Sequence, residues 1–126
     1  MPLLLILFFS TTISLAVTHI VALKLFLYWK YFWLDIPMHF LGGIACALGF
    51  SICLRMYSHV PRWYTTLSGY LLFTLFVGIS WEVFEIAVGF SIIDEHFVPD
   101  TTVDLLMDLV GGAIGYGIVN AIRKLE

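Results

Sequence analysis

Long apolar runs dominate the chain, and short polar stretches separate them. A helix that crosses a bilayer needs ~20 predominantly apolar residues. Four runs meet this length, at about 3–23, 36–56, 63–93 and 101–122. The third run is too long for one straight crossing, so it tilts or its end beyond Gly89 leaves the membrane. Because the connections are short, we predict an all-α, four-helix up-down bundle that forms a single transmembrane domain over residues 1–126.

The composition indicates that the solvent of this chain is lipid. Hydrophobic residues make up 61% of the chain and charged residues 12%, and the mean hydropathy is +1.00. Soluble domains carry about 45–50% apolar and about 25% charged residues. A soluble domain of this size could not bury so many apolar side chains. These values exclude a nucleic-acid-binding protein, a disordered chain and an ordinary soluble domain, so the expected partner is the lipid bilayer.

The first run and the basic residues predict how the chain is inserted. The first run resembles a signal peptide near Ser14–Ala16, but it lacks a basic start and stays apolar to Leu23, so we expect a retained span. Four basic residues lie on the side of the termini and two on the other side: Arg55, Arg62, Arg123 and Lys124 against Lys24 and Lys30. This excess favours both termini in the cytoplasm.

Acidic residues gather toward the end of the predicted bundle that lies away from the termini. Residues three or four positions apart share a face of a helix. Three predicted helices show this spacing: Asp35 and His39 on the second, Glu82 and Glu85 on the third, and Asp100, Asp104 and Asp108 on the fourth. A bundle can point these three faces at one place. The sequence therefore predicts a pocket of four or more carboxylates and one imidazole in the outer half of the bilayer.

Carboxylates inside a membrane need protonation, a basic partner or a cation, because each costs ~2.5–3.5 kcal/mol at mid-membrane. No Lys or Arg lies in the outer half of any predicted span. Carboxylates with one imidazole suit a divalent ion such as Mg, Mn, Ca, Fe or Zn. We predict a metal site made by Glu82, Glu85, Asp104, Asp108 and His39, in which His39 and Glu82 are also the catalytic candidates. Asp35, Asp100 and His19 are additional candidates.

Structural roles compete with this interpretation at some positions. Asp35 and Asp100 lie beside prolines and fit helix N-caps. Thr101-x-x-Asp104 fits a capping box weakly. The candidate residues His39 and His19 also fit ordinary hydrogen bonds to neighbouring groups. Glu82 and Asp108 lie too deep in their predicted helices for capping, so function is favoured there.

Small residues continue the second and fourth predicted helices beyond the acids. Gly43 with Ala47, and Gly111 with Gly115, have the small-xxx-small spacing that lets helix backbones approach closely. We expect these two helices to pack together beneath the site. The segment 35–43 also echoes the segment 104–112 at a constant offset of 69 residues, which indicates a weak 2+2 parallel internal repeat.

The order of these motifs resembles a known family. Asp35-x-x-x-His39-Phe, then Glu82-x-x-Glu85, then Asp100-x-x-x-Asp104-x-x-x-Asp108 followed by glycines resemble the YjdF-like family of small bacterial and archaeal membrane proteins. They are more distantly similar to the VanZ-like proteins associated with teicoplanin resistance. Ile36 stands where VanZ-like proteins usually have Lys, which favours the YjdF-like side. The resemblance implies a multi-pass protein of a prokaryotic inner membrane with this acidic site.

Three functions fit these observations. The first is a metal-dependent membrane enzyme, with hydrolysis as the simplest chemistry, acting on a lipid, a lipid-linked or a small exported substrate. The second is an ion- or proton-coupled transport protein. The inner half of the chain shows no polar relay, and four helices are few for a pathway unless the chain forms a homo-oligomer. The third is an accessory protein whose cation is structural. We favour the first.

Overall fold

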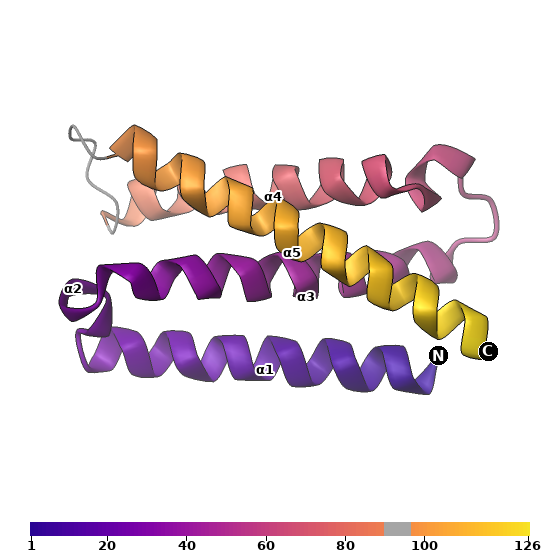
Figure 1. The fold of residues 1–126 in the computed structure, drawn as a ribbon, viewed down its shortest axis with the longest axis horizontal. Helices are drawn as coiled ribbons and strands as arrows, with labels where there is room; N and C mark the ends of the chain where they lie inside the picture. The colour runs from indigo at the N-terminus through magenta and orange to yellow at the C-terminus, as the bar shows by residue number, and fades with distance from the viewer. Residues whose placement is uncertain (90–96) are drawn as a thin grey trace.

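In the part of the chain that the structure describes, four long helices follow one another in up-down order (Figure 1). The structure is a computed structural model that describes residues 1–89 and 97–126. The long helices are α1 (Pro2–Lys24), α3 (Asp35–Met56), α4 (Leu67–Val88) and α5 (Phe97–Leu125). The short helix α2 (Leu27–Lys30) and the 3-10 turns η1 (Phe32–Leu34) and η2 (Arg62–Thr65) lie in the connections. All four long helices are long and apolar enough to cross a membrane. The predicted all-α membrane bundle is confirmed.

The third predicted run is divided in the structure, so its predicted start is wrong. Thr66 is the N-cap of α4, and its side chain accepts a hydrogen bond from the Gly69 N–H. This cap separates Trp63 in η2 from the long helix. At the other end, Gly89 adopts a left-handed conformation with φ 77° and ends α4. The long run therefore includes a turn and a crossing of ordinary length; its predicted end at 90–93 lies outside the described residues.

The capping roles considered for Asp35 and Asp100 are wrong. The N-cap of α3 is Leu34, and no side-chain cap hydrogen bond forms there. Helix α5 begins at Phe97, so Asp100 already lies inside it, and the predicted start at 101 is late by one turn. Thr101 does not cap either, since its hydroxyl donates to Glu82 on α4. Thr101 therefore takes part in a contact between helices rather than in a helix cap.

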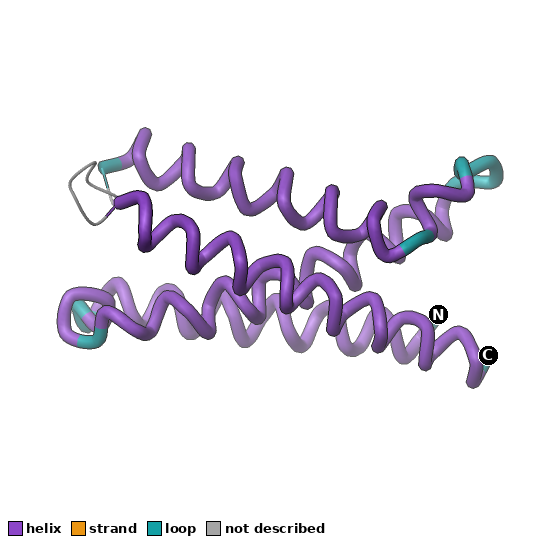
Figure 2. The backbone as a smooth tube through the Cα atoms, turned by 45° about the horizontal axis from the view of Figure 1, so that its top comes forward, coloured by secondary structure: helices purple, strands orange, loops and turns teal. Residues whose placement is uncertain are grey.

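Helices α3 and α5 form the central contact of the bundle, where α5 crosses α3 (Figures 1 and 2). A Cβ on Gly43 would overlap the backbone of Asp108, and one on Gly111 would overlap the Phe40 carbonyl. At Gly115 a Cβ would lie 2.6 Å from the Ala47 Cβ. The glycines therefore bring the two backbones into direct contact, as the small-residue spacing predicted.

Helices α1 and α4 flank this pair, and the termini mark one end of the molecule (Figure 1). A buried apolar core is made by Leu4, Ala47, Leu48, Phe50, Tyr70, Val119 and Ile122. At the end that carries the termini, Arg55 donates to Glu126 Oε2 over 2.7 Å, and the N-terminal amino group pairs with Glu126 Oε1. The candidate functional residues lie toward the opposite end, where α3 and α5 begin.

Candidate metal centre

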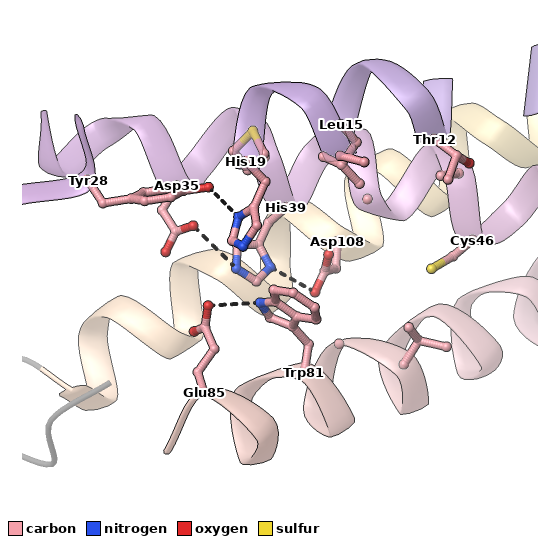
Figure 3. Close-up of a pocket in the computed structure, with 16 residues that line it drawn as sticks. Thr12, Leu15, His19, Tyr28, Asp35, His39, Cys46, Trp81, Glu85 and Asp108 are labelled. Atoms are coloured by element: carbon pink, nitrogen blue, oxygen red, sulfur yellow. Dashed lines mark hydrogen bonds and ion pairs between the residues drawn. The ribbon is translucent and has the colours of Figure 1, made fainter. Parts of the chain in front are cut away.

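One buried imidazole joins three helices. His39 lies one turn into α3 and is 6% exposed. Its Nδ1 is 3.2 Å from Asp108 Oδ2 on α5. Its Nε2 lies 3.9 Å from Asp35 Oδ1 and 3.8 Å from Glu82 Oε1 on α4 (Figure 3 shows the first two partners). The carboxylate on Nδ1 fixes the orientation of the ring, so Nε2 is directed at the other two acids.

Two glycines make room for the carboxylate that orients His39. A Cβ on Gly78 of α4 would overlap Asp108 Oδ2, and one on Gly42 of α3 would lie 3.8 Å from Asp108 Oδ1. Asp108 itself is 5% exposed. A side chain at Gly78 would push the carboxylate away from its hydrogen bond with His39. Gly78 is therefore part of the site, although the sequence offers no motif around it.

Further carboxylates lie around the other ring nitrogen of His39, Nε2. Ligand atoms of Asp35, His39 and Asp104 all lie within 4.8 Å of one another. Glu82 is 6% exposed; its Oε2 accepts a hydrogen bond from the Thr101 hydroxyl over 2.8 Å, and its Oε1 is buried without a hydrogen-bond partner. Within the described ranges, no Lys or Arg forms an ion pair with any of these acids. A buried carboxylate oxygen without a donor, beside an imidazole nitrogen, is chemically suited to a cation.

The structure places the predicted residues in three groups. His39, Glu82, Asp104 and Asp108 converge, and so does Asp35, which sequence reasoning ranked only as an addition. Glu85 lies beside this group and accepts a hydrogen bond from Trp81 Nε1 over 2.9 Å. Asp100 is exposed and lies outside the cluster. The polar sequence Asp94-Glu95-His96 is typical of a solvated loop, and it falls outside the described residues.

His19 reaches the same end of the bundle from α1, where it forms a hydrogen bond with Tyr28 of the short helix α2. Its Nδ1 is 2.8 Å from the Tyr28 hydroxyl, and its ring packs edge-on against Trp81 at 5.8 Å between centroids. Burial, and then the charges of Asp35 and Glu85, raise the pKa of Tyr28 to about 12. Tyr28 therefore stays protonated at physiological pH. The sequence could have indicated that Trp81 belongs to this end of the bundle, because it lies four residues before Glu85 on the same helix face.

A cavity of about 380 Å³ opens beside the cluster, between α1, α3 and α4. Figure 3 shows that its charged and aromatic side chains gather at one end, with Leu15, Thr12 and Cys46 at the other. Asp35, His39 and Asp108 belong both to the cluster and to the cavity wall. The wall therefore connects the buried acids with the space between the flanking helices.

Comparison with known families assigns the chain to a family of membrane proteins. A family model described as "Predicted membrane protein (DUF2238)" matches residues 1–124, so the chain belongs to this family. Neither the curated proteins nor the solved structures include a significant match. The family description agrees with the membrane assignment reached from the apolar runs.

Proposed function

We propose that this protein is a membrane metalloprotein that holds a divalent cation on Asp35, His39 and Asp104, and that it acts as a hydrolase at the membrane surface. The observation that carries the proposal is the position of His39 Nε2 among the carboxylates of Asp35, Glu82 and Asp104. In the described part of the chain, no Lys or Arg forms an ion pair with these acids, and His39 is the basic side chain among them.

The hydrogen bond on the other ring nitrogen supports a ligand role for His39. Metal-binding histidines commonly donate their second N–H to a carboxylate, which fixes the tautomer and raises the basicity of the ligand. Asp108 Oδ2 occupies this position, 3.2 Å from Nδ1. Mg²⁺ and Ca²⁺ prefer oxygen ligands only, whereas imidazole suits Fe and Zn. A mixed set of one nitrogen and several carboxylates therefore favours Mn, Fe or Zn among the predicted ions.

Glu82 is suited to a different role from the three ligands. Thr101 holds one of its carboxylate oxygens, and the other faces the site without a donor. A bound divalent ion supplies a nucleophile by lowering the pKa of a water molecule. Glu82 Oε1, 3.8 Å from His39 Nε2, would accept the proton of that water as a general base. His39 then serves as a ligand, and Glu82 becomes the catalytic residue.

The location of the site follows from charge and resemblance. The excess of basic residues on the side of the termini supports an orientation with both termini in the cytoplasm. The metal centre would then lie in the outer half of the membrane. The resemblance to YjdF-like proteins adds a prokaryotic inner membrane to this proposal.

Metal analysis of detergent-purified protein tests the proposal. We compare the parent with Asp104→Asn and with Asp100→Asn, which makes the same change one turn away on α5 at an exposed residue. The parent and Asp100→Asn should contain stoichiometric Mn, Fe or Zn after loading and dialysis, and Asp104→Asn should lose it. Circular dichroism verifies that each variant is helical. A parent without metal under every loading condition contradicts the metal centre, and metal retained in Asp104→Asn contradicts the ligand assignment.

Chelation separates a reactive ion from a structural one. The glycine-mediated contact of α3 with α5 does not involve the ligands, so we expect the chelated protein to remain folded. Unfolding of the chelated protein would instead show that the cation holds the helices together, and the hydrolase proposal would fail.

A further inference from the structure

The cavity beside His39 has a volume that suits a single hydrocarbon chain. Its volume of about 380 Å³ lies at the lower end of the ~300–1,000 Å³ range of ligand pockets. Most of its lining is apolar and includes Leu15, Ala45 and Val77 from three different helices, with Thr12 as a polar exception. Such a space accommodates a single hydrocarbon chain with a small head, rather than a bulky polar solute.

The cavity also has the length of one membrane leaflet. Its lining on α3 extends from Asp35 to Cys46, 11 residues apart, which is about 16 Å at ~1.5 Å per residue. Half of a ~30 Å hydrocarbon core has nearly the same length. An occupant whose head lies at Asp35 would therefore have its tail directed toward the bilayer midplane, as a lipid of that leaflet does.

The mouth of the cavity faces lipid. Ala16 on α1 and Trp81 on α4 both line the cavity and are both exposed. In the bundle, exposed side chains at this depth contact acyl chains. A membrane amphiphile can therefore reach the cavity laterally, between α1 and α4, without passing through water.

Acidic and aromatic side chains line the end of the cavity at Asp35, where the head group of the occupant would lie. The carboxylates of Asp35, Glu85 and Asp108 line it, together with the rings of Tyr28 and Trp81 and the imidazoles of His19 and His39, so the carboxylates outnumber the imidazoles. Carboxylates attract a cation in a poorly solvated site, and aromatic faces add cation–π attraction. An anionic head would be repelled by the same carboxylates. The chemistry of this end selects positive charge.

We infer that the cavity between α1, α3 and α4 binds a membrane amphiphile that has a single apolar chain in the cavity and an ammonium group beside Glu85, Tyr28 and Trp81. This ligand site goes beyond the proposed function and does not require the metal. The metal would bind at Nε2 of His39, whereas Glu85, Tyr28 and Trp81 belong to the cavity. The two sites share a wall, which would bring the head group next to the metal centre.

Photolabelling in lipid nanodiscs tests this inference. Three probes carry the same alkyl chain with a diazirine at its middle and differ only in the head: a primary ammonium, an alcohol and a phosphate. Mass spectrometry locates the labelled residues. We expect the ammonium probe to label the segments around Leu15, Cys46 and Val77 about tenfold more than the alcohol probe, which corresponds to ~1.4 kcal/mol of binding free energy. The phosphate probe should label them least.

A pair of matched variants locates the labelling. Ala16→Phe places a ring in the mouth of the cavity and should abolish the labelling by the ammonium probe. Ala87→Phe makes the same change at an exposed position of α4 outside the cavity lining, and should leave it unchanged. Retention of the labelling in Ala16→Phe would overturn the assignment of the cavity.

The choice of heads decides the charge of the occupant. Equal labelling by the three probes, or strongest labelling by the phosphate probe, would overturn the ammonium site. Each experiment is run with and without a chelator. Ammonium-selective labelling that persists under chelation supports the amphiphile site whether or not the protein binds metal. Labelling that depends on metal would contradict an independent site for the ammonium group.

Discussion

The carboxylates at the two ends of the bundle differ in their burial and in their basic partners. At the end that carries the termini, Glu126 is exposed and is neutralised by Arg55 and by the N-terminal amino group. At the other end, Glu82, Asp104 and Asp108 are buried to 94% or more and gather around one imidazole. Within the described residues, no Lys or Arg pairs with these three acids.

This difference separates a structural role of charge from a functional one. An exposed ion pair ties helix ends together at little cost, because water solvates both partners. Several buried acids that share one imidazole and have no Lys or Arg partner destabilise the bundle unless a further positive charge is supplied. The acidic end therefore has the character of a ligand site, and the opposite end that of a clasp between α3 and the chain termini.

The largest effect is expected from breaking the helix contact that positions the acidic end. In Gly43→Ala, the new Cβ would overlap the Asp108 backbone, which cannot move aside as a flexible side chain would. We expect the free energy of unfolding to fall by about 3 kcal/mol. Gly117→Ala is the matched control, because nothing lies within 4 Å of its added Cβ. Chemical denaturation in detergent measures both, and equal stability of the two variants would contradict the close contact.

Changing one carboxylate to an amide at each end sharpens the comparison. Asp108→Asn weakens the partner of His39 Nδ1, and we expect the metal affinity to fall ~10–100-fold, as for other carboxylates that orient metal-binding histidines. Glu126→Gln should leave the affinity unchanged. Competition with a metal-sensitive dye measures both variants. An equal loss of affinity in the two would show that the effect is not specific to the acidic end.

The single hydroxyl that supports Glu82 should have a smaller effect. Thr101→Val removes the donor to Glu82 Oε2 and leaves a buried carboxylate without this hydrogen bond. We expect the metal-free protein to lose about 1.5 kcal/mol of unfolding free energy. Thr102→Val is the control, because the exposed Thr102 hydroxyl donates to the Val98 carbonyl of its own helix and not to Glu82. A Thr101→Val variant as stable as Thr102→Val would contradict a supporting role for this hydroxyl.

The smallest effect is expected at the paired end. Hydrogen bonds from the N-terminal amino group and from Arg55 lower the pKa of Glu126 below its ordinary value of 4.5. Since the folded pKa is the lower one, the pair stabilises the fold above about pH 4.5 and loses this effect as the pH falls through the lowered value.

The difference in thermal midpoint between the parent and Glu126→Gln isolates this contribution. The parent should be slightly more stable at pH 7, and the difference should shrink below pH 4.5 and in high salt. A difference that persists at low pH would contradict the ion pair.

Periodicity and residue type predicted the helices and most of the acidic group. Apolar runs locate the four helices because membrane crossing depends on length and hydropathy alone. Helical spacing placed Glu82, Asp104 and Asp108 on inward faces. The start of α4 was wrong because hydropathy does not register the Thr66 cap that separates η2 from the helix. Gly78, Tyr28 and Thr101 were not recognised as parts of the site, because their contacts depend on how the helices pack against one another.

Anomalous diffraction from crystals loaded with Mn²⁺ or Zn²⁺ tests the central claim most directly, because it locates the ion and not only its amount. We predict one strong peak at ~2.0–2.2 Å from His39 Nε2 and from carboxylate oxygens of Asp35 and Asp104. The Nδ1 of His39 should keep its hydrogen bond to Asp108. Loaded crystals without a peak at this position, or with ions only at exposed groups such as Asp100 or His59, would contradict the metal centre.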